Sequence, residues 1–390
     1  MTKKNLYFYT LIVVLICSIT KVSAQDDLNM NAMLSRVDTN NMMLSNSHYI
    51  WCNSVVKGTD GKYHFFFSQW PHGKKKLDDD SLNYIFDGFS GWQKYSEIAY
   101  AVADSLTGPF TYKGVILKGT GEAGRWDRFM MTNPQIRCFK GKYYLYYVSN
   151  SFNPNLTFKK DYNRTQLQWF RYNCTQHIGV AVADSPEDFL KGNFKTSKNP
   201  IMSPDGVTRI EITNNPSVTK GPDGKYYMIF KSRISELGHM TMWMARSDYP
   251  DKGFTVISKV FTDPDMACED PCLWYDYKRE RFYAAVKYFS NKGTIISQFG
   301  GLALITSKNG TDWEVAKNPL VSLRQLMMKD GRVMELANLE RPFVYTDEMG
   351  QPLALFGAFS IVKQGSYKVD DYTPACNTGN VGIILMPVKK

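Results

Sequence analysis

Two adjacent carboxylates, Glu269 and Asp270, stand directly before Pro271 and an apolar run of residues. Carboxyl groups can donate or accept protons in a reaction, and two of them placed close together raise the pKa of one member. Glu340 stands at the same place relative to a second proline, Pro342, later in the chain. These residues supply the groups for general acid and base catalysis, provided that the fold brings them together.

The acidic sites belong to a motif that occurs five times. Each copy has a short polar start, a proline in four of the five cases, a turn, and then a run of aromatic and β-branched residues. The copies start at Cys52, Asn133, Asn215, Asp270 and Arg341. Further strand-like runs follow, such as Ile98–Ser105 and Ile178–Ser185. Five matched units predict an all-β, five-bladed β-propeller with four antiparallel strands per blade. The alternative is a β-sandwich whose hairpins resemble one another.

Propeller geometry predicts which segments share a face. The first strand of each blade lines the central channel, and successive strands alternate in direction. The starts of the first strands therefore lie on the same face as the loops between second and third strands. The two longest such loops, residues 70–96 and 151–176, are rich in aromatic residues. Long ordered loops more often carry function than short linkers do, so we expect these two to crown the face that holds the carboxylates.

The carboxylates expected on this face are the catalytic candidates. We assign Glu269 as general acid, Asp270 as the neighbour that raises its pKa, and Glu340 as the partner base. Asp127 and Glu211 are further candidates for the base, because flanking arginines keep a carboxylate ionised. Structural pairing with those arginines is an equally good explanation of both.

Polar and aromatic side chains of the same face are candidates for ligand binding. Arginines can grip an anionic group, tryptophans can stack on sugar rings, and asparagines can position water or hydroxyl groups. A histidine could donate a proton near neutral pH or bond a hydroxyl group. The candidates are Asn53, Trp70, Arg128, Asn133, His177, Arg209, Asn215, Arg233 and Arg341.

No cofactor or metal is expected from the motifs. Cys268 and Cys272 lack a second pair of cysteine or histidine residues at metal-ligand spacing. The sequence also lacks a glycine-rich phosphate loop, an HExxH motif and a nucleophile elbow.

The N-terminus predicts export. Residues 1–24 have a positive start, an apolar run and a small-residue cleavage site, which is the pattern of a signal peptide. We expect an N-terminal segment over residues 25–47, one propeller catalytic domain over 48–390, and a periplasmic or secreted protein. No later stretch is apolar enough to span a membrane. Loss of Lys3, Lys4 and Lys21 would lower the formal net charge from +10 to +7. No lysine or arginine run of the nucleic-acid-binding type is present, so no nucleic-acid partner is expected.

The repeated start, followed by Asp-Gly-Lys-Tyr-Tyr and combined with Ala-Val-Ala-Asp-Ser, resembles a known group of enzymes. These are the five-bladed β-propeller glycoside hydrolases, which include families 43, 32, 62, 68, 117 and 130. The resemblance covers residues 48–388 and implies an oligosaccharide or polysaccharide substrate cleaved by two carboxyl groups.

The chain departs from the pattern of family 43 at the start of the first blade. That family implies a catalytic aspartate at the first blade's strand start and a general-acid glutamate in an E-x-P motif. The segments 269–271 and 340–342 match the E-x-P motif, but Cys52 and Asn53 occupy the first-blade position. The chain is therefore not assignable to an individual family of this group.

The sequence thus predicts an exported, exo-acting glycoside hydrolase that trims a plant or algal polysaccharide, with acidic sugars as one option. Two alternatives stay open. A glycan-binding propeller without catalysis would explain the missing first-blade aspartate. A family 130-like glycoside phosphorylase would explain the arginines.

Overall fold

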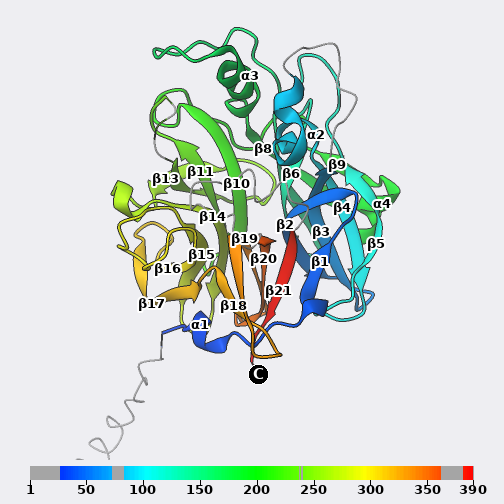
Figure 1. Cartoon of the computed structure of the whole chain (residues 1–390), viewed down its shortest axis with the longest axis vertical. Coiled ribbons are helices and arrows are strands. Elements are labelled where there is room, and N and C mark those ends of the chain that lie inside the picture. The colour runs from blue at the N-terminus through cyan, green and yellow to red at the C-terminus, as the bar shows by residue number, and fades with distance from the viewer. Residues whose placement is uncertain (1–26, 73–82, 237, 239, 362–380, 390) are drawn as a thin grey trace, which may run out of the picture.

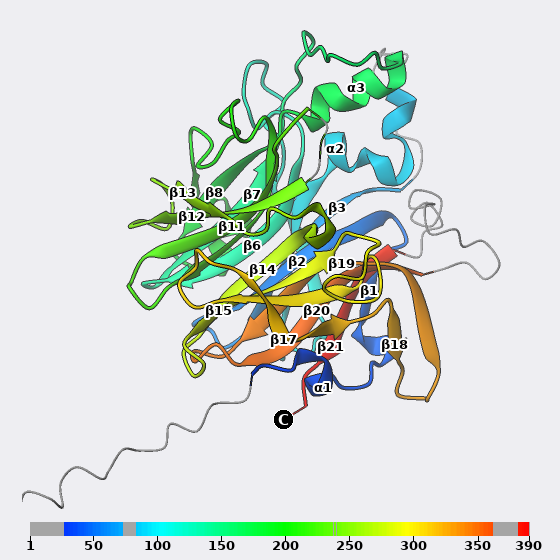
Figure 2. The same ribbon diagram turned by 90° about the vertical axis from the view of Figure 1, so that its left-hand side faces the viewer.

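Five antiparallel sheets form a ring in the computed structural model, which confirms the predicted five-bladed β-propeller (Figure 1; Figure 2 gives a second view). The structure describes residues 27–72, 83–236, 238, 240–361 and 381–389. The expected signal peptide over residues 1–24 lies outside the described residues.

Each blade contributes one four-stranded meander, counted outward from the channel. Blade one consists of β2 (His48–Lys57), β3 (Tyr63–Pro71), β4 (Glu97–Ala103) and β5 (Thr111–Leu117). Blade two consists of β6 (Met131–Phe139), β7 (Lys142–Ser149), β8 (His177–Ala183) and β9 (Phe194–Thr196). Blade three consists of β10 (Glu211–Lys220), β11 (Tyr226–Arg233), β12 (Met240–Ser247) and β13 (Thr255–Lys259). Blade four consists of β14 (Cys268–Asp276), β15 (Arg281–Tyr288), β16 (Leu302–Ser307) and β17 (Glu314–Ser322).

The fifth sheet joins the two ends of the chain. It contains β19 (Val333–Thr346), β20 (Pro352–Ile361) and β21 (Val381–Pro387), with the short β18 (Gln325–Met327) beside β19. Its outermost strand is β1 (Met42–Leu44), which pairs antiparallel with β21. The segment expected before the propeller therefore closes the ring by supplying the fourth strand of blade five.

The seam between β1 and β21 is sensitive to a single methyl group. A Cβ atom added at Gly382 would lie 2.2 Å from the backbone oxygen of Met43. We expect Gly382→Ala to push β1 away from β21 and to destabilise the protein by about 1–3 kcal/mol, the usual cost of overpacking. Urea unfolding followed by tryptophan fluorescence measures this loss. An unchanged unfolding midpoint would show that the seam does not support the ring.

The second strands are buried on both faces because each blade packs between two neighbours. In β3, the consecutive residues Phe65, Phe66 and Phe67 are all buried. Phe65 packs against Phe356 of blade five, whereas Phe66 packs against Phe189 of blade two. A continuous apolar run, rather than strict alternation, is the sequence pattern of such a strand.

The two long aromatic loops lie together at one end of the molecule, where α2 and α3 are found at the top of the view (Figure 1). The first loop contains η2 (Asn83–Phe86), η3 (Gly88–Gly91) and α2 (Trp92–Tyr95), and the second contains α3 (Arg164–Asn173). Rings from the two loops contact each other, with centroids 4.9 Å apart for Phe86 and Tyr172. The loops therefore brace one another above the face on which the first strands begin.

The remaining helical segments are short. They are α1 (Met30–Met33), η1 (Thr39–Asn41), α4 (Pro186–Lys191) and η4 (Pro264–Met266). Among the described residues, no helix has the length and apolar character needed to cross a membrane.

Candidate active site

Each first strand has the same backbone distortion at the start of the motif. The φ angles are 47° at Cys52, 55° at Asn133 and Asn215, 58° at Asp270 and 51° at Arg341. The ladder to the second strand shifts register at the same point in all five blades. Asparagine and aspartate tolerate a positive φ better than most residues, which explains three of the five residue types. Non-glycine residues held in this conformation cluster at functional sites.

The five distorted positions meet at the axis and join through their side chains. The Cys52 thiol donates to Asn133 Oδ1 (3.0 Å), and Asn133 Nδ2 donates to Asn215 Oδ1 (2.7 Å). Asn215 Nδ2 donates to Asp270 Oδ1 (2.7 Å), which also lies 3.1 Å from Nη1 of Arg341. This axial chain runs from Cys52 to Arg341, and Asp270 supplies its carboxyl group.

A pocket opens between blades four and five beside this axis, with a volume of about 410 Å³. Its floor contains the three carboxylates Glu269, Asp270 and Glu340, and its cations include Lys287, Arg324 and Arg341. Phe289 and Phe299 supply an aromatic wall. The pocket is of the size that small-molecule ligands occupy, and it holds polar groups beside an apolar surface. We call it the carboxylate pocket.

Two lysines connect the carboxylates of this pocket. Glu269 lies 2.7 Å from Nζ of Lys231 and 3.1 Å from Nζ of Lys287. Lys287 also donates to Glu340, so one ammonium group joins the glutamates of blades four and five. All four side chains are buried or nearly so. Removal of Lys287 would take one of two cations from Glu269 and an ammonium partner from Glu340, a costly change for buried charges.

The surroundings move the pKa values of the adjacent acids in opposite directions. Burial would raise the pKa of Glu269, but Lys231 and Lys287 outweigh burial and hold that pKa well below its usual range. Burial raises the pKa of Asp270 to about 6, with a further contribution from Glu269 and opposition from Arg341. The prediction that Asp270 raises the pKa of Glu269 is therefore wrong in direction, because the two lysines were not anticipated. Asp270, not Glu269, has the pKa of a general acid.

The two other predicted bases lie outside the carboxylate pocket. Asp127 is buried and receives two bonds of 2.7 Å from the guanidinium of Arg125. Glu211 starts β10 and pairs with Arg233 across the blade, 3.2 Å apart. Arginine pairing, the structural explanation allowed by the sequence, accounts for both residues.

Some of the predicted ligand-binding side chains line the channel or the carboxylate pocket, and the others are engaged elsewhere in the fold. Asn133 and Asn215 belong to the axial chain, and Arg341 lines both the channel and the carboxylate pocket. Asn53 also lines the channel, and neither polar atom of its buried amide has a hydrogen-bond partner among the residues that the structure describes.

Several other candidates are engaged in packing. Arg209 pairs with Asp205 at 3.0 Å, and the Arg128 guanidinium lies over the Phe129 ring. Trp70 is 2 % exposed and packs against aromatic neighbours, so its faces are not available to a sugar ring.

His177 does not have the pKa expected of a proton donor near neutral pH. Burial lowers the pKa of its imidazole to about 4. Its Nδ1 lies 3.0 Å from the Ser203 hydroxyl, and its ring meets Trp126 edge-on. The neutral imidazole can still bond a hydroxyl group.

The sequence contained a signal for the lysines that was missed. Lys231 and Lys287 each follow an apolar run in the second strand, and the register places them opposite Asn214 and Glu269. A lysine at the same position in the second strands of two consecutive blades, directly after an apolar run, indicates a charge facing the channel. Phe289, Phe299 and Arg324 carried no comparable signal, because they lie in irregular segments outside the repeat.

No family model matches the chain, and no curated protein matches its sequence. Solved structures do share its fold. A family 117 glycoside hydrolase of the marine bacterium Zobellia galactanivorans is 17% identical, with a TM-score of 0.56 over 90% of this chain and 88% of that one.

Two further similar structures are described as an arabinofuranosidase and an endo-arabinase. The α-L-arabinofuranosidase of Lactobacillus brevis is 12% identical, with a TM-score of 0.54 over 90% of this chain and 92% of its own. The endo-arabinase of Bacteroides thetaiotaomicron is 12% identical, with a TM-score of 0.51 over 91% and 98%. At these identities the likeness establishes the common propeller fold.

Proposed function

We propose that this protein is a glycoside hydrolase that binds the end of a carbohydrate chain in the carboxylate pocket. The observation that carries the proposal is the meeting of Glu269, Asp270 and Glu340 in one pocket beside an aromatic wall. Glycosidic cleavage needs one carboxylic acid to protonate the leaving oxygen and one carboxylate to activate water or attack carbon. The propellers with a similar fold include glycoside hydrolases, which agrees with this chemistry.

In this proposal Asp270 is the proton donor and Glu340 is the base. Burial keeps part of Asp270 protonated in mildly acidic solution. Glu340 lies at the equivalent place of the next blade and bonds to Lys287, which orients its carboxylate. Glu269 stays ionised between its two lysines and suits a hydrogen-bond acceptor for sugar hydroxyl groups.

The residues of the pocket and its surroundings support a proposal for the class of substrate. Lys287, Arg324 and Arg341 line the pocket, so an acidic sugar would find cations there. The two aromatic loops contact each other on the face where the first strands begin, and we take this as support for attack at a chain end. Together with the signal-peptide pattern of residues 1–24, these features support an exported, exo-acting enzyme for a plant or algal polysaccharide.

A screen of the purified protein against neutral and acidic plant and algal oligosaccharides tests the proposal. Release of a reducing sugar that Asp270→Asn abolishes would support hydrolysis. Product formation that requires inorganic phosphate would instead indicate phosphorolysis.

A carbohydrate-binding propeller without catalysis is the second candidate. It is favoured by the complete pairing of Glu269 with two lysines and of Asp270 with Arg341. Calorimetric titration with the same oligosaccharides separates the two functions. Binding without turnover, undiminished in Asp270→Asn, would identify a binding protein.

The raised pKa of Asp270 predicts a pH dependence of hydrolysis. The acid must be protonated to work, and its pKa is about 6. We expect kcat/KM to fall with rising pH above about 6, approaching tenfold per pH unit, because the free enzyme loses its proton donor. A pH profile of kcat/KM on the best substrate measures this limb. A plateau that extends past pH 8 would assign the acid to another group.

A further inference from the structure

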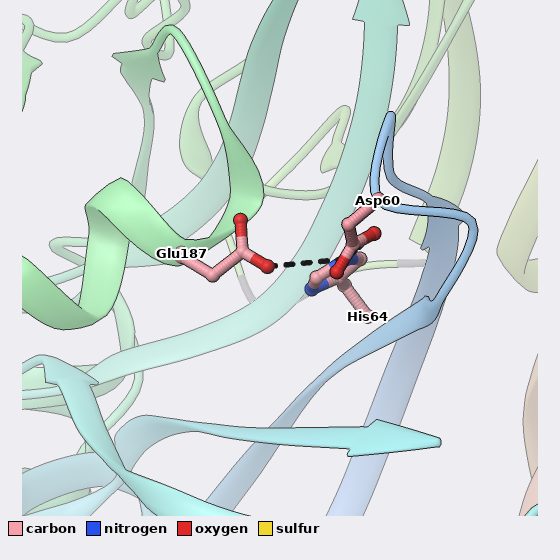
Figure 3. Close-up of side chains that lie close together, drawn as sticks. All are labelled: Asp60, His64 and Glu187. Atoms are coloured by element: carbon pink, nitrogen blue, oxygen red, sulfur yellow. Dashed lines mark hydrogen bonds and ion pairs between the residues drawn. The ribbon is translucent and has the colours of Figure 1, made fainter. Parts of the chain in front are cut away.

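A second cluster of chemically capable side chains lies at the opposite end of the propeller, between blades one and two. Asp60 stands in the turn between β2 and β3, His64 lies in β3, and Glu187 lies in α4 of blade two (Figure 3). The turn between a first and a second strand lies away from the face on which first strands begin. This cluster is therefore separate from the carboxylate pocket.

The donor atoms of the three side chains are spaced like the ligands of a metal ion. Nε2 of His64 is 3.1 Å from Oδ1 of Asp60 and 3.7 Å from Oε1 of Glu187. One donor atom from each residue lies within 4.8 Å of the other two. Zinc bonds to nitrogen and oxygen ligands are about 2.0–2.2 Å long, so tetrahedral ligands lie roughly 3.3–3.5 Å apart. The observed separations bracket that value.

The imidazole of His64 is fixed so that Nε2 points at the two carboxylates. The ring is fully buried, and Nδ1 lies 2.5 Å from the Tyr100 hydroxyl. A neutral phenol oxygen can accept a bond from Nδ1–H, which leaves the Nε2 lone pair free for a cation. A hydrogen bond at the second nitrogen is the usual way in which a metal-binding histidine is oriented.

Gly58 keeps the space beside the donor atoms open. A Cβ atom at this position would lie 2.4 Å from Nε2 of His64 and 2.5 Å from Oδ1 of Asp60. Its φ angle is not in the left-handed region, so backbone conformation does not demand glycine here. The absence of a side chain therefore leaves room at the two atoms that would bind an ion.

The charges of the cluster favour a cation. Within the described residues, the ion-pair partner of both Asp60 and Glu187 is the same imidazole. Two carboxylates that face the same imidazole repel each other, and a divalent ion would remove that repulsion. Both carboxylates are about one-third exposed, so an ion and a water ligand can reach them from solvent.

We propose that Asp60, His64 and Glu187 bind a divalent transition-metal ion of the zinc type, with water as the fourth ligand. One nitrogen and two carboxylate oxygens suit zinc better than calcium or magnesium, which prefer oxygen ligands. Because Glu187 comes from blade two and the other ligands come from blade one, the ion would fasten neighbouring blades together. Its role is structural, because it lies on the face opposite the carboxylate pocket.

The test uses the full-length protein after treatment with a chelator and dialysis against zinc chloride. We expect about one zinc ion per chain by mass spectrometry after gel filtration. We also expect the thermal midpoint to rise by about 5 °C when zinc exceeds its dissociation constant a hundredfold. Replacement of zinc by cobalt(II) should give visible absorption bands of a low-symmetry, four-coordinate site.

Glu187→Gln and Asp60→Asn should each lose the bound zinc and the thermal shift. These residues are partly exposed, so the variants are expected to fold, whereas His64 is buried in the blade. Asp184→Asn is the matched control, because Asp184 is an exposed carboxylate of the same blade paired with Lys142. Zinc retained equally by Glu187→Gln and the control, or a wild-type protein that binds no zinc, would overturn the proposal.

Discussion

Asp270→Asn should hydrolyse the identified oligosaccharide about 10²–10⁴-fold more slowly than the wild-type protein, the range expected for loss of general acid catalysis. The amide preserves the side-chain shape and can still meet Asn215 at the axis, but it has no proton to deliver to the leaving oxygen. The loss should fall mainly on kcat, because the proton is transferred in the transition state. Steady-state kinetics on the best substrate of the screen measures this effect.

An activated substrate and a control variant test whether the loss of activity comes from the missing proton of Asp270. Substrates with an activated leaving group need less protonation, so their hydrolysis by Asp270→Asn should fall less than that of the natural glycoside. Glu314→Gln removes an exposed carboxylate of the same blade, which pairs with Arg281, and should retain the wild-type rate. An Asp270→Asn variant that keeps full kcat on the natural substrate would show that another residue is the acid.

Lys287→Met should destabilise the protein by about 3–5 kcal/mol, the usual consequence of removing one partner from a buried ion pair. The ammonium group of Lys287 joins Glu269 and Glu340, and all three side chains are buried or nearly so. After the substitution Glu269 keeps Lys231, but Glu340 loses the cation that faces it. The free energy of unfolding, from urea titration at neutral pH, measures the effect.

A double variant separates the charge from the packing of the side chain. In Lys287→Met with Glu340→Gln, the carboxylate left without Lys287 is also neutralised, so part of the stability should return. Lys142→Met is the control, because its partner Asp184 is exposed and such surface pairs contribute less than about 1 kcal/mol. Equal losses in Lys287→Met and the control would show that solvent screens the pocket charges.

The five-bladed architecture was predictable because the repeated motif marks the same backbone conformation at the start of each first strand. Asn133, Asn215 and Asp270 tolerate the positive φ of the bulge, and the following proline marks the place in four of five blades. Once this position is recognised, the blade count and the face that carries Glu269 and Glu340 follow from strand alternation. These inferences depend on local sequence, which is where single-sequence reasoning is strongest.

The electrostatics of the site were less predictable because they arise between blades. Lys287 contacts Glu340 across a gap of more than fifty residues, and Lys231 reaches Glu269 from the neighbouring blade. No sequence pattern reports such a contact, so the direction of the Glu269 pKa was predicted wrongly. Burial explains why two other predicted site residues do not face a ligand. Trp70 and Asp127 lie on the expected face, but neighbouring side chains pack against them or bond to them.

The pairing of β1 with β21 has a consequence for the order of assembly. The strand that completes the fifth sheet precedes blades one to four in the sequence, whereas its partner β21 follows all of them. Blades one to four can form their own meanders as they emerge, but β1 must wait for almost the whole chain. Among the strand pairs of the described residues, this one closes the longest loop and therefore carries the largest entropic penalty. We expect the final folding step to be the joining of the two ends, and a chain truncated before β21 to remain an open ring.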